Sequence, residues 1–133
     1  MSKENVEIVR LAYERLNGGD IDGFFQLCAT DFEFHDVPEL PGSGVFIGHD
    51  AFRGWYEKLL DAFEDLRFEA EEFIDTPGDC VVVANRAIGR GRGSGAKVEM
   101  LFSTVATVSD GKVIRQIAYS DHADALEAAG LPG

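Results

Sequence analysis

The second half of the chain is a series of four strand-length stretches, rich in β-branched and aromatic residues and separated by turn residues. The stretches run over residues 66–74, 80–89, 97–108 and 113–120. The turns between them are Pro77-Gly78-Asp79, the glycine-rich run Gly89 to Gly95, and Ser109 to Lys112. Connections this short join neighbouring antiparallel strands. The second half therefore predicts an antiparallel sheet, with a bulge at Glu71-Glu72 where the alternation slips by one residue.

The first half of the chain carries helical patterns instead. The apolar stripe of a first helix consists of Val6, Val9, Tyr13 and Leu16. Asn17-Gly18-Gly19 ends this helix, and Asp20 caps a short second one. Asp50 starts a third helix, and Asp121 caps a closing helix over residues 123–129. The chain thus begins with helices and continues with strands.

This order predicts a single α+β domain spanning residues 1–133. We expect a cone-shaped, curved antiparallel sheet wrapped around about three N-terminal helices, a cystatin-like α+β barrel, with a short C-terminal helix. The helices are expected on a single face of the sheet. A sheet that curls around its helices leaves a cone whose open mouth can hold a ligand.

The composition of the chain limits which partners it can bind and in which cellular compartment it is expected. A formal net charge of −12 argues against nucleic acid and anionic membranes as partners. Cys28 and Cys80 form no metal-binding motif and sit in apolar runs, which indicates reduced, buried thiols and a cytoplasmic protein. No segment approaches the length of a membrane span. His35, His49 and His122 each neighbour an aspartate but lack zinc-binding spacing, so no metal is predicted.

The candidate site lies on the strand that follows Thr30-Asp31 and ends at Pro38, before a loop expected over residues 38–48. Alternation places Phe32, Phe34 and Asp36 on one face and Glu33, His35 and Val37 on the other. A carboxylate beside aromatic rings is partly desolvated, which disfavours its charged form. Asp36 is therefore a candidate to exchange protons with a small apolar ligand. A register slip near the proline would exchange the roles of Asp36 and His35.

Motifs along the chain carry a family resemblance. The motifs are Leu16 to Asp20, Phe32 to Pro41, Gly48-His49-Asp50, Ala62 to Leu66, Gly89 to Gly95, Ser109 to Lys112 and Ala125 to Leu131. Together with the order of elements, they resemble the nuclear-transport-factor-two-like superfamily. The closer similarity is to its SnoaL-like branch, named for a polyketide cyclase. This fold hosts enzymes, ligand binders and protein-binding modules, so the resemblance implies the fold more strongly than the chemistry.

The resemblance does not extend to the catalytic residues of two enzymes in the superfamily. The base of ketosteroid isomerase corresponds to Asp36, but its helix tyrosine falls on Ala12, with Tyr13 one residue off the face. Its protonated aspartate falls near Thr104. The resemblance therefore implies no pair of strong oxyanion donors. The Asp-Arg-Asp constellation of limonene-epoxide hydrolase falls on Asn85, Ala87 and Ala118, which cannot protonate an epoxide.

The SnoaL-like pattern implies an acidic residue and a histidine near the mouth of an apolar cone. Asp36 is the candidate base for cofactor-free cyclisation or isomerisation of a polyketide-, steroid- or terpenoid-like molecule, and His35 is the second candidate. The candidate ligand-binding lining is Phe34, Trp55, Tyr56, Leu59, Asn85, Met100, Phe102, Gln116 and Ser120.

The alternative hypothesis is a protein without catalytic activity, which binds a ligand or a partner. The outer face of the long strands carries Val105, Ile117 and Tyr119 beside Arg86 and Arg115. An apolar face with charged flanks favours a homodimer through this outer sheet face.

Overall fold

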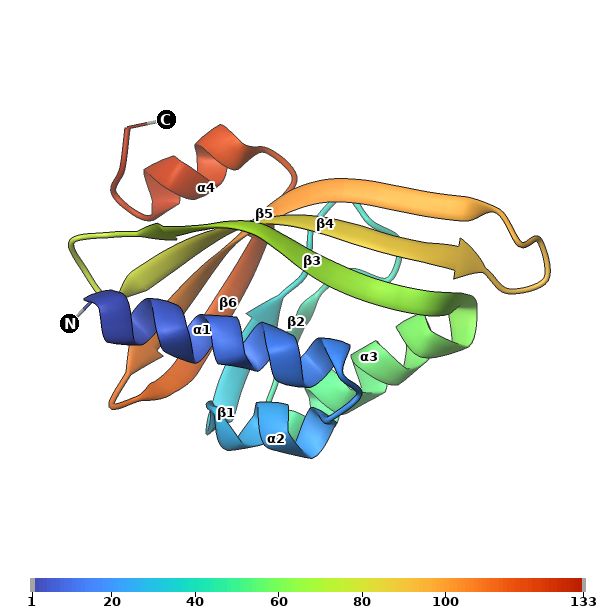
Figure 1. Ribbon diagram of the computed structural model, residues 1–133, viewed down its shortest axis with the longest axis horizontal. Helices are drawn as coiled ribbons and strands as arrows, with labels where there is room; N and C mark the ends of the chain where they lie inside the picture. Colours follow the sequence, from blue (N-terminus) through green and yellow to red (C-terminus); the bar gives the residue numbers. More distant parts are fainter. Residues whose placement is uncertain (1, 133) are drawn as a thin grey trace.

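The computed structural model describes residues 2–132 and has the predicted α+β architecture (Figure 1). Six strands form one sheet, and helices lie on both of its faces. The elements are α1 (Ser2–Asn17), α2 (Ile21–Gln26), β1 (Cys28–His35), β2 (Val45–Ile47), α3 (His49–Ala62), β3 (Phe63–Asp75), β4 (Cys80–Gly91), β5 (Lys97–Ser109), β6 (Lys112–Tyr119) and α4 (His122–Ala128).

The strand order is β2-β1-β6-β5-β4-β3. The strands β3 to β6 pair antiparallel, as their short connections predict. One neighbouring pair departs from the antiparallel expectation, because β1 runs parallel to β6. The two strands are separated by most of the chain, so no turn between them signals their relative direction.

Local irregularities shape the sheet. The register of β3 against β4 shifts between Ala70 and Glu72, which confirms the predicted bulge. A second shift between Glu64 and Arg67 was not predicted. Bulges bend a strand and increase its twist, so these two account for part of the curvature of β3 around the helices.

The helices do not all lie on one face, and this expectation was wrong. In Figure 1, α1, α2 and α3 lie on one side of the sheet and α4 lies on the other. Helix α4 packs against Val82 and Val105 through Ala125. The caps of α2 and α4 were predicted correctly, whereas α3 begins at His49, one residue before the predicted Asp50, with Gly48 as its N-cap. Asp20 accepts a hydrogen bond from the Gly23 amide at 2.9 Å, and Asp121 accepts one from Ala123 at 2.8 Å.

Two boundaries near the candidate site differ from the prediction. The strand β1 begins at Cys28, before the expected turn at Thr30-Asp31. The expected loop contains the short strand β2, which pairs with β1 by setting Phe46 opposite Phe34. A three-residue strand gives too little alternation to be recognised in a sequence.

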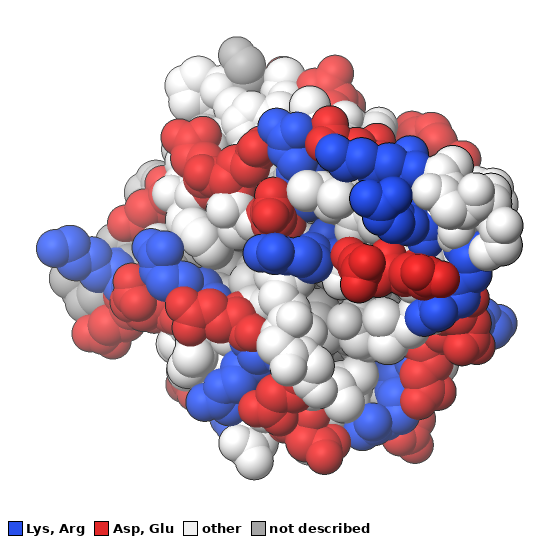
Figure 2. Space-filling view, turned by 45° about the vertical axis from the view of Figure 1, so that its right-hand side comes forward, with Lys and Arg blue, Asp and Glu red and all other residues white. Residues whose placement is uncertain are grey.

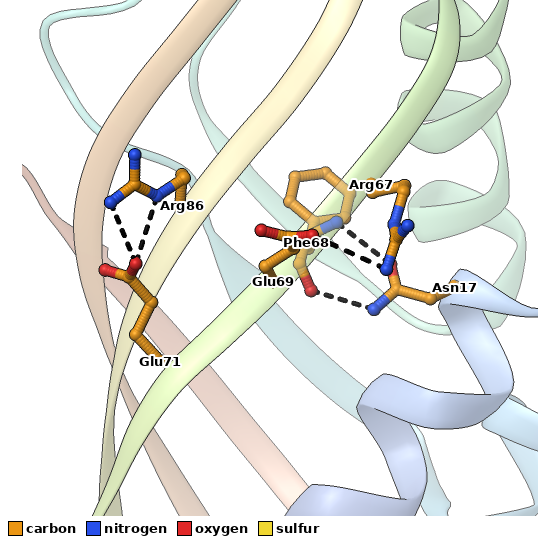
Figure 3. A network of polar contacts seen from close by, with 6 residues as sticks. All are labelled: Asn17, Arg67, Phe68, Glu69, Glu71 and Arg86. Atoms are coloured by element: carbon orange, nitrogen blue, oxygen red, sulfur yellow. Dashed lines mark hydrogen bonds and ion pairs between the residues drawn. The ribbon is translucent and has the colours of Figure 1, made fainter.

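Asn17 fastens the end of α1 to the sheet. Its side-chain amide donates to the Phe68 carbonyl at 2.8 Å and accepts from the Phe68 amide at 2.9 Å (Figure 3). The side chain therefore pairs with the edge strand β3 as a neighbouring strand would. Elsewhere on the sheet, Arg86 forms an ion pair with Glu71 at 2.9 Å. Because α1 is held against β3, its apolar stripe becomes one wall of the internal cavity.

Candidate functional site

A cavity of about 470 Å³ lies between the inner face of the sheet and helices α1 and α3. Its volume falls in the range of small-molecule binding sites. Buried residues such as Val9 and Phe24 form part of its wall, while Leu40 and Val98 at its edge are 36% and 40% exposed. The cavity therefore extends from the core to the surface. Its lining is mostly aliphatic and aromatic, which suits an apolar ligand.

Among the described residues, the polar side chains of the lining are few. They are Tyr13, Asp36, Lys58 and Gln116, with the indole N–H of Trp55. Lys58 is exposed and lies on α3. A small number of polar groups in an apolar wall is the usual arrangement for orienting a ligand.

The structure brings seven of the residues chosen from the sequence into this lining. They are Phe34, Asp36, Trp55, Leu59, Met100, Phe102 and Gln116. Four others lie outside it. His35 points to the outer face, where its Nε2 lies 3.1 Å from Glu33 Oε1. Tyr56 is buried beside the cavity and donates to the Leu16 carbonyl. Ser120 follows the last residue of β6, and Asn85 is buried behind the lining.

Two hydrogen bonds orient the Asp36 carboxylate. Its Oδ2 accepts from Trp55 Nε1 at 3.1 Å, and its Oδ1 accepts from the Val37 amide at 2.8 Å. Trp55 packs against Phe34 at 4.4 Å between ring centroids, so the indole itself is held in place. Asp36 is half-buried in the cavity wall. Each oxygen keeps a free lone pair, so the carboxylate can still take a proton from a ligand.

Tyr13 is a residue that the family resemblance misplaced. It lines the cavity, and its hydroxyl lies 3.1 Å from Thr104 Oγ1. Burial raises the pKa of Tyr13 to about 12, with Thr104, Asn85 and Gln116 partly offsetting the rise. The phenol is therefore neutral at physiological pH. The helical stripe of the sequence already contained Tyr13, so the periodicity was the better guide to its orientation.

Asn85 and Thr104 stand behind Tyr13 on the inner face of the sheet. Asn85 Nδ2 donates to the Val83 carbonyl at 2.9 Å and to Thr104 Oγ1 at 3.3 Å. Asn85 Oδ1 is buried and has no hydrogen-bond partner among the residues that the structure describes. Both side chains are almost fully buried, at 2% and 1% exposure. The polar groups behind Tyr13 thus come from two neighbouring strands, β4 and β5.

Within residues 2–132, no three His, Cys, Asp or Glu side chains gather as ligands for a metal ion. None of the helices in the same range has the length and apolar character needed to cross a membrane. Figure 2 shows acidic and basic side chains interleaved over one face of the molecule, without a large field of either sign.

The curved sheet, the helices on its inner face and the cavity between them define an α+β protein of the nuclear-transport-factor-2-like class. The chain belongs to the SnoaL-like domain family, whose sequence profile matches residues 9–116. No curated protein matches the chain in a sequence comparison.

Solved structures agree with this assignment. A nuclear-transport-factor-2-like protein from Burkholderia xenovorans LB400 is 29% identical, with 97% of each chain covered and a TM-score of 0.77. A proposed SnoaL-like polyketide cyclase from Jannaschia sp. CCS1 is 22% identical, with 99% of this chain and 95% of that chain covered and a TM-score of 0.76. TerC, co-crystallised with polyporic acid, is 24% identical over 86% of this chain and 89% of its own, with a TM-score of 0.76. The last two establish a shared fold only.

Proposed function

We propose that this protein binds a small apolar molecule in the cavity between α1, α3 and the sheet, and that Asp36 acts on it as a base. The observation that carries this proposal is an oriented, half-buried carboxylate in an otherwise apolar wall. A carboxylate at a position with little water is suited to proton transfer at carbon. TerC, which shares this fold, was co-crystallised with polyporic acid, and this supports a cyclic, oxygen-bearing ligand for the present cavity.

The proposed chemistry needs no cofactor. Asp36 removes a proton from the carbon next to a ligand carbonyl, and the C–H electron pair becomes an enolate. The enolate carbon then forms a bond to a second carbonyl carbon of the same molecule; the π electron pair of that carbonyl moves to its oxygen, which takes the proton back from Asp36, and a ring is closed. If the ligand instead carries a C=C bond beyond that carbon, the enolate is conjugated with it and takes the proton back at the far end of the C=C bond. These outcomes are cyclisation and isomerisation. The similarity to a proposed polyketide cyclase from Jannaschia favours the first.

Deuterium exchange at the methyl group of 2-acetylnaphthalene, followed by NMR in D2O, tests the role of Asp36. The wild type is expected to accelerate exchange, and Asp36→Asn to slow it by about 100-fold or more. Glu39→Gln is the matched control, because Glu39 is exposed in the adjoining loop and this substitution removes one negative charge, as Asp36→Asn does. Equal exchange in the wild type and Asp36→Asn would remove Asp36 as the base. Saturable binding without exchange would leave a ligand-binding protein.

A partner surface is the second candidate, favoured by the uncovered part of the outer sheet face. Val45, Ile47 and Leu101 are 55%, 60% and 60% exposed. The register sets Ile47 opposite Glu33, which lies 3.7 Å from Arg115. Apolar side chains with charges of both signs beside them can match a second copy of the same face. Helix α4 covers Val105 and part of Tyr119, so the surface is smaller than the sequence predicted.

A further inference from the structure

Lys58 is the only cation in the described lining of the cavity, and helical spacing places it there. Trp55, Lys58 and Leu59 share one face of α3, and all three line the cavity. Trp55 and Leu59 are half-buried, whereas Lys58 is exposed. A lysine in such a position lays its aliphatic stem along apolar surface and keeps its ammonium group in water. The ammonium group therefore lies at the open end of the cavity.

The ammonium group of Lys58 has no ion-pair partner among the residues that the structure describes. The cations of the described ion pairs are Arg10, His35, Arg53, Arg67, Arg86, Arg92 and Arg115. Asp36, the only carboxylate of the described lining, is held instead by the Trp55 indole and the Val37 amide. Lys58 thus brings a positive charge to the cavity without a counterion from the described part of the chain.

The end of α3 does not require this lysine. Cations near the C-terminal end of a helix often bond its last carbonyl groups. In this helix Arg92 has that role, because its Nε donates to the Leu60 carbonyl at 3.0 Å and its backbone amide donates to the Ala62 carbonyl at 3.0 Å. Neither ion pairing nor helix capping accounts for Lys58, so its charge is available to a ligand.

A ligand that uses both the wall and the ammonium group has an apolar body and one anionic end. The body lies inside, because the wall is mostly aliphatic and aromatic. The anionic end stays at the mouth, because an apolar interior is costly for a charge. A carboxylate fits this position better than a phosphate. A single ammonium group beside the negative end of the α3 dipole gives little support to a dianion.

We propose that the ligand is a keto acid whose carboxylate pairs with Lys58 at the mouth of the cavity, so that Lys58 selects the free acid over its ester. The inference rests on the proposed function, which supplies the ketone beside Asp36. Trp55 holds Asp36, and Lys58 follows Trp55 by three residues, about 4.5 Å along the helix axis. The ketone and the carboxylate of one small molecule can therefore reach Asp36 and Lys58 together.

Two probes that differ by one methyl group test this inference. At neutral pH, 6-acetyl-2-naphthoic acid is an anion and its methyl ester is uncharged, and quenching of Trp55 emission reports the dissociation constant of each. The ratio of the two constants, ester over acid, is expected to fall about threefold from the wild type to Lys58→Met, the effect of an exposed ion pair. Lys58→Arg should keep the ratio. Lys97→Met is the matched control, because Lys97 is exposed, carries the same charge and lies outside the described lining.

The salt dependence of the ratio is a readout that altered packing alone would not move. High concentrations of sodium chloride screen an ion pair at the mouth, so they are expected to lower the ratio in the wild type but not in Lys58→Met. An equal ratio in the wild type and Lys58→Met, or an equal fall in Lys97→Met, would overturn the role of Lys58 while saturable binding of the ester upholds the cavity. Failure of the acid, the ester and 2-acetylnaphthalene to bind the wild type would instead overturn the proposed function, and this inference with it.

Discussion

At the scale of single residues, the sequence predicted that Asp36 faces the cavity but not which groups hold its carboxylate. Alternation along the strand predicted before Pro38 placed Phe34 and Asp36 on the same face, and both line the cavity, although β1 itself ends at His35. The bond from Trp55 to Asp36 joins residues of different elements, and no local pattern encodes it. Tyr56 and Asn85 were assigned to the right region but lie behind the lining. Whether these two side chains reach the cavity surface depends on how the helices pack on the sheet, and the periodicity of the sequence does not specify that packing.

Cys28 gives a prediction for alkaline pH. Burial raises the pKa of this thiol from 9.0 to about 12, with the Lys112 ammonium group opposing the rise. Above pH 9 the unfolded chain loses the thiol proton while the folded chain keeps it. The folded state then binds more protons, so the free energy of unfolding falls as pH rises. The loss attributable to Cys28 is on the order of 1 kcal/mol between pH 8 and 10.

Urea unfolding of the wild type and Cys28→Ala at half-unit steps from pH 8 to 10 measures this effect. The range stays below pH 10 because the raised pKa values of Tyr13 and Tyr56 add their own loss above it. The variant is expected to be less stable at pH 8, because it leaves a small cavity, but to lose less stability on going to pH 10. Parallel curves for the two proteins would contradict the assignment.

At the scale of elements, helices and antiparallel strands followed from local signals. Capping residues, glycines and short turns lie beside the elements they delimit, so the sequence alone located α2, α4 and the hairpin between β5 and β6. The hairpin turn at Asp110-Gly111 has φ values of 51° and 76°, as expected for a type I′ turn. The parallel pairing of β1 with β6 and the position of α4 are long-range, and their signals were absent from any one segment.

The contact between Asn17 and β3 is expected to stabilise α1 on the sheet. Asn17→Ala removes two hydrogen bonds to the Phe68 backbone, which leaves an edge strand without that partner. The expected loss is about 1–2 kcal/mol, measured by urea unfolding. Glu14→Ala is the control, because Glu14 is exposed on the same helix. A loss no larger than that of the control would show that the contact contributes nothing.

At the scale of the whole molecule, the outer sheet face is expected to join two copies of the chain. Light scattering at micromolar concentration should give a dimer mass. Ile47→Glu places a charge in the apolar patch and should shift the protein to monomer, whereas Leu60→Glu on α3 should not. A monomer mass for the wild type at this concentration would refute the dimer without affecting the cavity.

The cavity itself is the central claim, and Trp55 offers a direct measurement. It is the only tryptophan of the chain and lies in the lining, so its emission reports on the cavity alone. Titration with 2-acetylnaphthalene is expected to quench Trp55 saturably, and Ala87→Phe, which fills part of the cavity from β4, to abolish the saturable phase. Quenching that rises linearly, or that is identical in Ala87→Phe, would contradict a ligand-binding cavity.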